Sequence, residues 1–85
     1  MRVTLIGSHL CPDTVAAMNR LLAEGAEIEY KDILSCHRDL REYLNLRDNS
    51  PVFDEVRGTD RLGVPCFITE DGTVTLNIAD VLGHR

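Results

Sequence analysis

Residues 2–33 constrain the fold most strongly, because one helical segment lies there between two segments of β type. The run RVTLIG (residues 2–7) is short and rich in β-forming residues, which predicts a first strand. A helix is predicted over residues 12–24, since proline suits a first helical position and Gly25 follows its end. The run EIEYKDI (residues 27–33) alternates apolar and charged residues, as a half-buried strand does. This unit implies a right-handed crossover and a parallel pair of strands.

Both long helices that we predict carry a stripe of apolar side chains at helical spacing, which we expect to face the core. The second helix is expected to begin after a cap at Ser35 and to extend to about Arg47. The stripe of the first helix consists of Val15, Met18 and Leu22, with Leu21 beside it. The stripe of the second helix consists of Cys36, Leu40, Tyr43 and Leu44.

The rest of the chain predicts a short helix, a hairpin and a last helix. Ser50 and Pro51 are typical of the cap and first residue of a helix that extends to Val56 and stops at Gly58. The runs GVPCFIT, EDG and TVTL predict a strand, a turn and a returning strand. Asn77 is expected to cap a final helix with Ile78, Val81 and Leu82. The hairpin adds antiparallel strands, so the sheet is expected to be mixed.

The overall composition indicates a single small domain. The chain has 85 residues, of which 44% are hydrophobic and 27% charged, and its formal net charge is −5. An acidic balance argues against nucleic-acid binding, which usually needs a basic face. No apolar run approaches the roughly 20 residues that span a bilayer, and a secretion-signal pattern is missing at the start. We therefore expect a cytoplasmic protein with neither nucleic acid nor membrane as partner.

The three cysteines, Cys11, Cys36 and Cys66, are expected to act as thiols. Their odd number, in a chain expected to meet a reducing compartment, argues against a disulfide framework. No two of them are close in sequence, so metal-ligand spacing is missing and no metal is expected.

Cys11 stands within HLCPDT (residues 9–14), directly before the first predicted helix. Amides that open a helix lack an intrahelical acceptor and carry partial positive charge, which stabilises a thiolate and lowers its pKa. Pro12 stiffens the turn, and Thr14 can offer its hydroxyl to the sulfur, whereas the charge of Asp13 opposes the thiolate. The alternative is that Cys11 is a small hydrophobic residue at a strand-to-helix turn.

A second signal is Val64-Pro65 at the start of a predicted strand. Proline cannot donate to a sheet ladder and is confined to strand beginnings, edges and bulges. A cis bond there would leave the Val64 backbone facing outward, open to a peptide strand or a thiol ligand.

Together these features resemble the glutaredoxin branch of the thioredoxin fold, over nearly the whole chain. The predicted order matches that fold, CPDT stands where the family has Cys-Pro-x-Cys or Cys-Pro-x-Ser, and GVPCF is similar to its Thr-Val-Pro segment. The resemblance implies an α/β protein with βαβαββα order, three layers and a four-stranded mixed sheet. One such domain would occupy residues 1–85.

The resemblance also implies roles for particular residues. Cys11 would be the catalytic thiolate, and Pro12, Val64 and Pro65 would contact the substrate, with Pro65 as the cis-proline. Thr14 occupies the position of the second cysteine, so the chemistry of the motif would use a single thiol. The family's lysine before the nucleophile and its Gly-Gly-x-Asp segment are missing here, and both bind glutathione. No cofactor is required, and glutathione stays a candidate ligand only.

Cys66 is open to two interpretations, whereas Cys36 has one. Cys66 follows the presumed cis-proline directly, which makes it a candidate resolving thiol that displaces a mixed disulfide on Cys11. The alternative for Cys66 is a buried strand cysteine, and Cys36 is interpreted as core or half-buried packing on the second helix.

We therefore expect a thiol–disulfide oxidoreductase that acts through a mixed disulfide on a small-molecule thiol or protein disulfide, as a monomer more readily than a dimer. Two alternatives belong to other classes. One is a redox-silent binding module that uses Val64-Pro65 to bind a partner strand. The other is a monothiol dimer that binds an iron–sulfur cluster.

Overall fold

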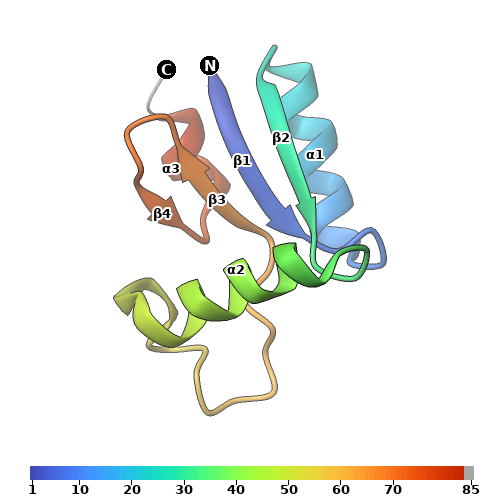
Figure 1. Ribbon diagram of the computed structural model, residues 1–85. Coiled ribbons are helices and arrows are strands. Elements are labelled where there is room, and N and C mark those ends of the chain that lie inside the picture. Colours follow the sequence, from blue (N-terminus) through green and yellow to red (C-terminus); the bar gives the residue numbers. More distant parts are fainter. Residues whose placement is uncertain (84–85) are drawn as a thin grey trace.

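The computed structural model, which describes residues 1–83, confirms the predicted α/β fold with a four-stranded mixed sheet (Figure 1). The strands are β1 (Arg2–Gly7), β2 (Glu27–Asp32), β3 (Cys66–Thr69) and β4 (Val74–Thr75). The helices are α1 (Pro12–Ala23), α2 (His37–Asn49) and α3 (Ile78–Leu82), with a 3-10 turn η1 (Pro51–Phe53) after α2. In the order β2-β1-β3-β4, β1 and β2 are parallel, and the other two pairs are antiparallel.

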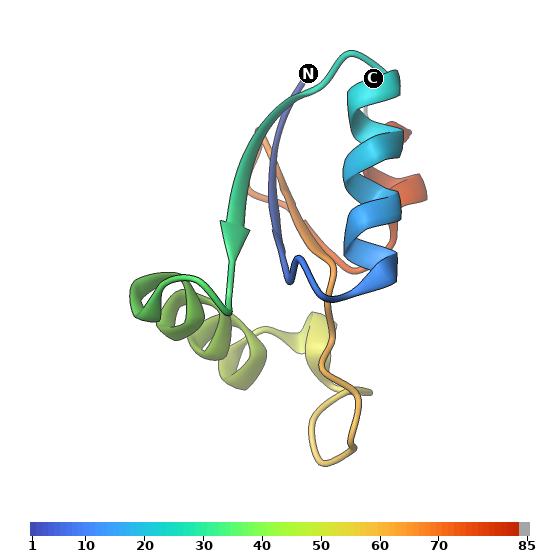
Figure 2. The same ribbon diagram turned by 90° about the vertical axis from the view of Figure 1, so that its right-hand side faces the viewer.

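The helices form a layer on each face of the sheet. Figure 2 shows α1 and α3 on one face and α2 on the other, where α2 crosses near the carboxyl ends of β1 and β2. The core accordingly consists of two clusters. The cluster on the α1 face contains Val3, Leu5, Ala17, Leu21, Phe67 and Val81. The cluster on the α2 face contains Ile6, Ile33, Tyr43, Phe53, Val56 and Cys66.

The inward face of α1 differs from the predicted stripe. The buried residues are Thr14, Ala17 and Leu21, whereas Val15 and Leu22 are exposed. Met18 is partly buried against the core, as predicted. The buried face is the one that places Thr14 against Gly7 of β1 and Leu21 in the core.

The cap of the second helix lies one residue later than predicted. Cys36, not Ser35, precedes α2, because Leu34 and Ser35 donate backbone N–H bonds to Asp32 at the end of β2. Those bonds hold the two residues in a turn. Cys36 is half-buried, as one of the predicted alternatives had it, but it precedes α2 instead of lying in its stripe, and Leu44 is exposed. Tyr43 carries the stripe, with Leu40 partly buried beside it.

The remaining elements follow local signals in the sequence. The Ser50 side chain accepts from the N–H of Val52 at 3.4 Å and caps η1, which is shorter than the predicted helix. The Asn77 side chain accepts from the N–H of Ala79 at 3.0 Å and caps α3, as predicted. Gly72, with φ of +86°, turns the chain between β3 and β4. No helix within residues 1–83 has the length and apolar character needed to cross a membrane.

Phe53 is the aromatic centre of the cluster on the α2 face. Its ring meets the ring of Tyr43 edge-on, with centroids 5.8 Å apart at 80°, and Phe53 has no exposed surface. Phe53→Ala should lower the free energy of unfolding by about 3–5 kcal/mol, because it leaves a cavity between η1 and the sheet. Val52→Ala, at the exposed neighbouring position, should cost less than about 1 kcal/mol. Urea unfolding of both variants measures this, and equal losses would contradict the packing described.

Candidate functional site

The turn between β1 and α1 positions Cys11 at the carboxyl end of β1 (Figure 1). The N–H of Cys11 donates to the Ser8 carbonyl at 3.0 Å, and the Ser8 hydroxyl accepts from the N–H of Leu10 at 3.0 Å. Cys11 itself has an extended backbone, and its carbonyl accepts the N–H of Val15 at 3.1 Å as the helix begins. The half-buried thiol therefore lies at the start of α1, where the first backbone N–H groups have no acceptor within the helix.

Thr14 connects this helix start to the sheet. It is 1% exposed, and its Oγ1 accepts the N–H of the buried Ser8 at 3.4 Å. A Cβ atom on Gly7 would lie 2.4 Å from Thr14 Oγ1, so only glycine lets the helix approach this closely. The sequence identifies Gly7 as the end of a strand, but the reason for it is this contact with Thr14.

The pKa of the Cys11 thiol is lowered from its ordinary value. The largest cause is a hydrogen bond from the Thr14 side chain, and the backbone N–H groups of Thr14 and Asp13 add to it. Desolvation and the charge of Asp13 oppose the shift without reversing it. The site thus raises the thiolate fraction of Cys11 above that of an ordinary cysteine, and the thiolate is the nucleophilic form.

Asp32, at the end of β2, joins the two loops beside the thiol. Its carboxylate accepts the N–H of Leu34 at 2.9 Å, the N–H of His9 at 3.3 Å, and contacts His9 Nδ1 at 2.5 Å. Burial raises the pKa of Asp32, but the hydrogen bonds from Leu34 and His9 outweigh it, and the pKa is lowered overall. The His9 side chain therefore pairs with Asp32, although half of it remains exposed.

Tyr30 is a residue near the thiol that the sequence reasoning missed. Its pKa is raised by burial first, then by Asp32, and also by the charge of Cys11. Tyr30 and Asp32 are two residues apart on β2, so their side chains share one face of the strand. Both residues lie near the carboxyl end of β2, next to the start of α1. The alternation of β2, combined with the parallel pairing, was the signal that could have identified Tyr30.

The bond between Val64 and Pro65 is cis, and it directly precedes β3. Because Ile6 pairs with Cys66 in an antiparallel register, Pro65 lies beside Gly7, the residue that Thr14 contacts. Val64 and Pro65 are half-buried, and Pro12 is exposed at the first position of α1. The structure thus brings Cys11, Thr14 and Pro65 to one end of the sheet.

The structure places Cys66 elsewhere. Its side chain has no exposed surface and belongs to the cluster on the α2 face, whereas Cys11 precedes the helix on the other face. Desolvation raises the pKa of the Cys66 thiol to about 12. This is the environment of a core cysteine. Cys36 precedes α2, is half-buried and, like the other two, is a free thiol.

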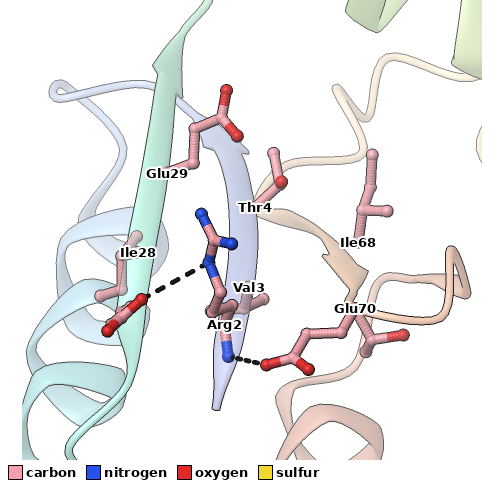
Figure 3. A pocket seen from close by; sticks show the side chains of 9 residues that line it. Arg2, Val3, Thr4, Ile28, Glu29, Ile68 and Glu70 are labelled. Carbon is pink, nitrogen blue, oxygen red and sulfur yellow. Dashed lines mark hydrogen bonds and ion pairs between the residues drawn. The ribbon is translucent and has the colours of Figure 1, made fainter.

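One surface hollow lies along α1 on the Cys11 side of the sheet, and another lies at the end of the sheet away from Cys11. One, of about 480 Å³, lies between α1 and α3, and its lining includes Asp13, Arg20, Pro65 and Asn77. The other, of about 810 Å³, is the open sheet face at the opposite end of β1 (Figure 3). The charged groups of the second hollow are paired, since Arg2 contacts Glu27 at 3.4 Å and its N–H donates to Glu70. Residues 1–83 contain no group of three or more His, Cys, Asp or Glu arranged to hold a metal ion.

Comparison with known proteins gives a distant relationship over most of the chain. A protein of Haemophilus influenzae (strain ATCC 51907 / DSM 11121 / KW20 / Rd), described as an uncharacterized protein, is 28% identical over 75 residues. The match covers 88% of this chain and 87% of that protein. No family model and no solved structure matches the chain. The element order and the mixed sheet are compatible with a thioredoxin-like fold.

The role of Thr14 gives a direct prediction for the reactivity of Cys11. Thr14→Val removes the hydroxyl that lowers the pKa of the thiol, so the pH midpoint of Cys11 alkylation should rise. Thr14→Ser keeps a hydroxyl and should keep the midpoint close to that of the wild type. The measurement is the iodoacetamide rate at Cys11 across pH, with unfolding curves to show that each variant is folded. Equal midpoints for all three chains would refute the role given to this hydroxyl.

Proposed function

We propose that the protein is a thiol–disulfide oxidoreductase of glutaredoxin type, with Cys11 as its nucleophile. The observation that carries the proposal is the half-exposed Cys11 thiol, whose pKa is lowered by Thr14 and by the amides that open α1. Thiol–disulfide exchange depends on the thiolate fraction of the attacking sulfur and on access to it. Both conditions are favoured at this position.

The reaction proceeds by two exchanges of sulfur partners. In the first, the Cys11 thiolate attacks one sulfur of a disulfide R–S–S–R′, which forms Cys11–S–S–R and releases R′–S⁻. In the second, an external thiolate R″–S⁻ attacks the R sulfur, forms R–S–S–R″ and regenerates the Cys11 thiolate. Each step breaks one S–S bond and forms another, so no further oxidant or reductant is needed. Thr14 stabilises Cys11 each time it is the thiolate.

In this scheme the second step uses an external thiol, because neither Thr14 nor Cys66 serves as the resolving group. Thr14 carries no sulfur, and Cys66 is enclosed in the core on the α2 face with its thiol pKa raised to about 12. The hollow lined by Pro65, together with the Val64 backbone and Pro12, is the proposed contact for the R group. Glutathione, a small thiol or a protein thiol would each serve as R″ in this scheme.

The covalent intermediate provides the test. Incubation with 2-hydroxyethyl disulfide should add one hydroxyethylthio group to Cys11 at neutral pH, and added thiol should remove it. The Cys66→Ala variant should form and release this adduct at the wild-type rate, because Cys66 takes no part, whereas Cys11→Ser should form none at this rate. Peptide mapping by mass spectrometry locates the adduct.

Other outcomes would point to other functions. An adduct that moves from Cys11 into a Cys11–Cys66 disulfide would replace the external thiol by an internal one. A Cys11 that reacts no faster than a denatured thiol would contradict the enzyme altogether. In that case, partner binding that Cys11→Ser leaves unchanged would support the redox-silent binding module.

A further inference from the structure

Four exposed apolar side chains lie at the end of the sheet where Cys11 precedes α1. We call them the Cys11 apolar surface, and they are Leu10, Val15, Tyr30 and Leu34. Leu10 is 72% exposed, Leu34 57%, Val15 45% and Tyr30 36%. Hydrophobic residues that are scattered singly over a surface are normal, but these four come from four segments that meet at the end of the sheet where Cys11 lies.

The convergence follows from the contacts of the loops. The Asp32 carboxylate accepts the backbone N–H groups of His9 and Leu34, so the loop before α1 and the loop after β2 lie against each other. Figures 1 and 2 show these two loops at the same end of the sheet. Val15 lies one turn after Cys11 on α1, and its N–H donates to the Cys11 carbonyl. Tyr30 is close enough for the charge of Cys11 to affect its titration.

The charges near this surface oppose anionic ligands. Asp13 follows Cys11 by two residues, and the Asp32 carboxylate pairs with the His9 ring. No lysine or arginine lies within eight positions of Cys11 in the sequence. Lys31, on β2, contacts Glu42 of α2, so it is engaged on the other face of the sheet. A ligand with two carboxylates, such as glutathione, therefore meets acidic and apolar groups here.

The neighbouring edge of the sheet is open to a main chain. Within residues 1–83, β2 pairs with β1 alone, so its outer edge has no strand partner. The N–H of Glu27 donates to the carbonyl of Met1, directly before β1, at 2.8 Å, and the N–H of Ile33 donates to the carbonyl of Gly7 at 2.9 Å. Alternate residues between them, which include Tyr30, direct their backbone groups away from β1. A polypeptide could use this edge, whereas a small disulfide has no main chain to pair with it.

We propose that the Cys11 apolar surface binds polypeptide disulfides in which apolar side chains flank the cysteine. The proposal rests on the function proposed above and names its substrate class. Leu10, Val15 and Leu34 would bury their exposed area against those flanking side chains while Cys11 attacks the disulfide. The gain is the free energy of removing apolar surface from water.

Two activated peptides of equal length test this directly. Each carries its cysteine as a 2-pyridyl disulfide, with Leu on both sides of the cysteine in one peptide and Ser in the other. Attack by the Cys11 thiolate forms the Cys11–peptide disulfide and releases 2-thiopyridone, whose absorbance gives the rate. We expect the Leu peptide to react about tenfold faster, since burial of part of a leucine side chain is worth about 1.4 kcal/mol.

Matched variants locate the preference on the surface. The Leu10→Ser/Leu34→Ser double variant should reduce the rate ratio between the two peptides to about one. Leu44→Ser removes a leucine that is 43% exposed on α2 and should leave the ratio unchanged. All three positions are exposed, so the variants should fold, and thermal unfolding verifies that they do.

The outcomes separate this proposal from the function on which it rests. Equal rates for both peptides, with Cys11 still reactive, would overturn the apolar substrate class and leave the oxidoreductase in place. No thiopyridone release beyond that of Cys11→Ser would overturn the function itself. If sedimentation shows a dimer that Leu10→Ser/Leu34→Ser separates without changing the rate ratio, the surface binds a second copy and the proposal is wrong.

Discussion

The contact between Thr14 and Gly7 determines the geometry of this protein's thiol. Thr14 is buried between α1 and the sheet, and Gly7 has no side chain to keep it away. The contact brings the start of α1, and with it Cys11, to the end of β1. The hydroxyl of Thr14 accepts a bond from Ser8 and also stabilises the Cys11 thiolate. One side chain therefore joins the packing of the fold to the chemistry of the site.

The environments of Cys11 and Cys66 explain why the same residue type has opposite properties in one chain. Cys11 lies where backbone and side-chain donors are available, and these lower the pKa of its thiol. Cys66 lies among apolar side chains, where only desolvation acts and the pKa rises to about 12. Alternation along β3 directs Cys66 toward the α2 face, whereas Cys11 precedes the helix on the opposite face. The proposed exchange therefore uses an external thiol rather than Cys66.

Features that depend on neighbouring residues were predictable from the sequence. The bounds of β1, the caps at Ser50 and Asn77 and the order of the elements are set by short patterns, and they agree with the structure. The position of Cys11 before a helix, and the unusual Val64-Pro65 before a strand, are local in the same sense.

Features that depend on distant contacts were not predictable in this way. The stripe with Val15 and Leu22 is wrong because the approach of Thr14 to Gly7, across the layers, sets the rotation of α1. The cap at Ser35 is wrong because Asp32 engages that turn. Tyr30 becomes a neighbour of Cys11 only through the parallel pairing of β1 and β2.

The central claim is that folding lowers the pKa of the Cys11 thiol. The most direct measurement is the ultraviolet absorbance of the thiolate across pH, taken as the difference between wild type and Cys11→Ser, in the native chain and in urea. A lower midpoint in the native chain than in urea is the predicted result. A native midpoint equal to or above that of the unfolded chain would contradict it.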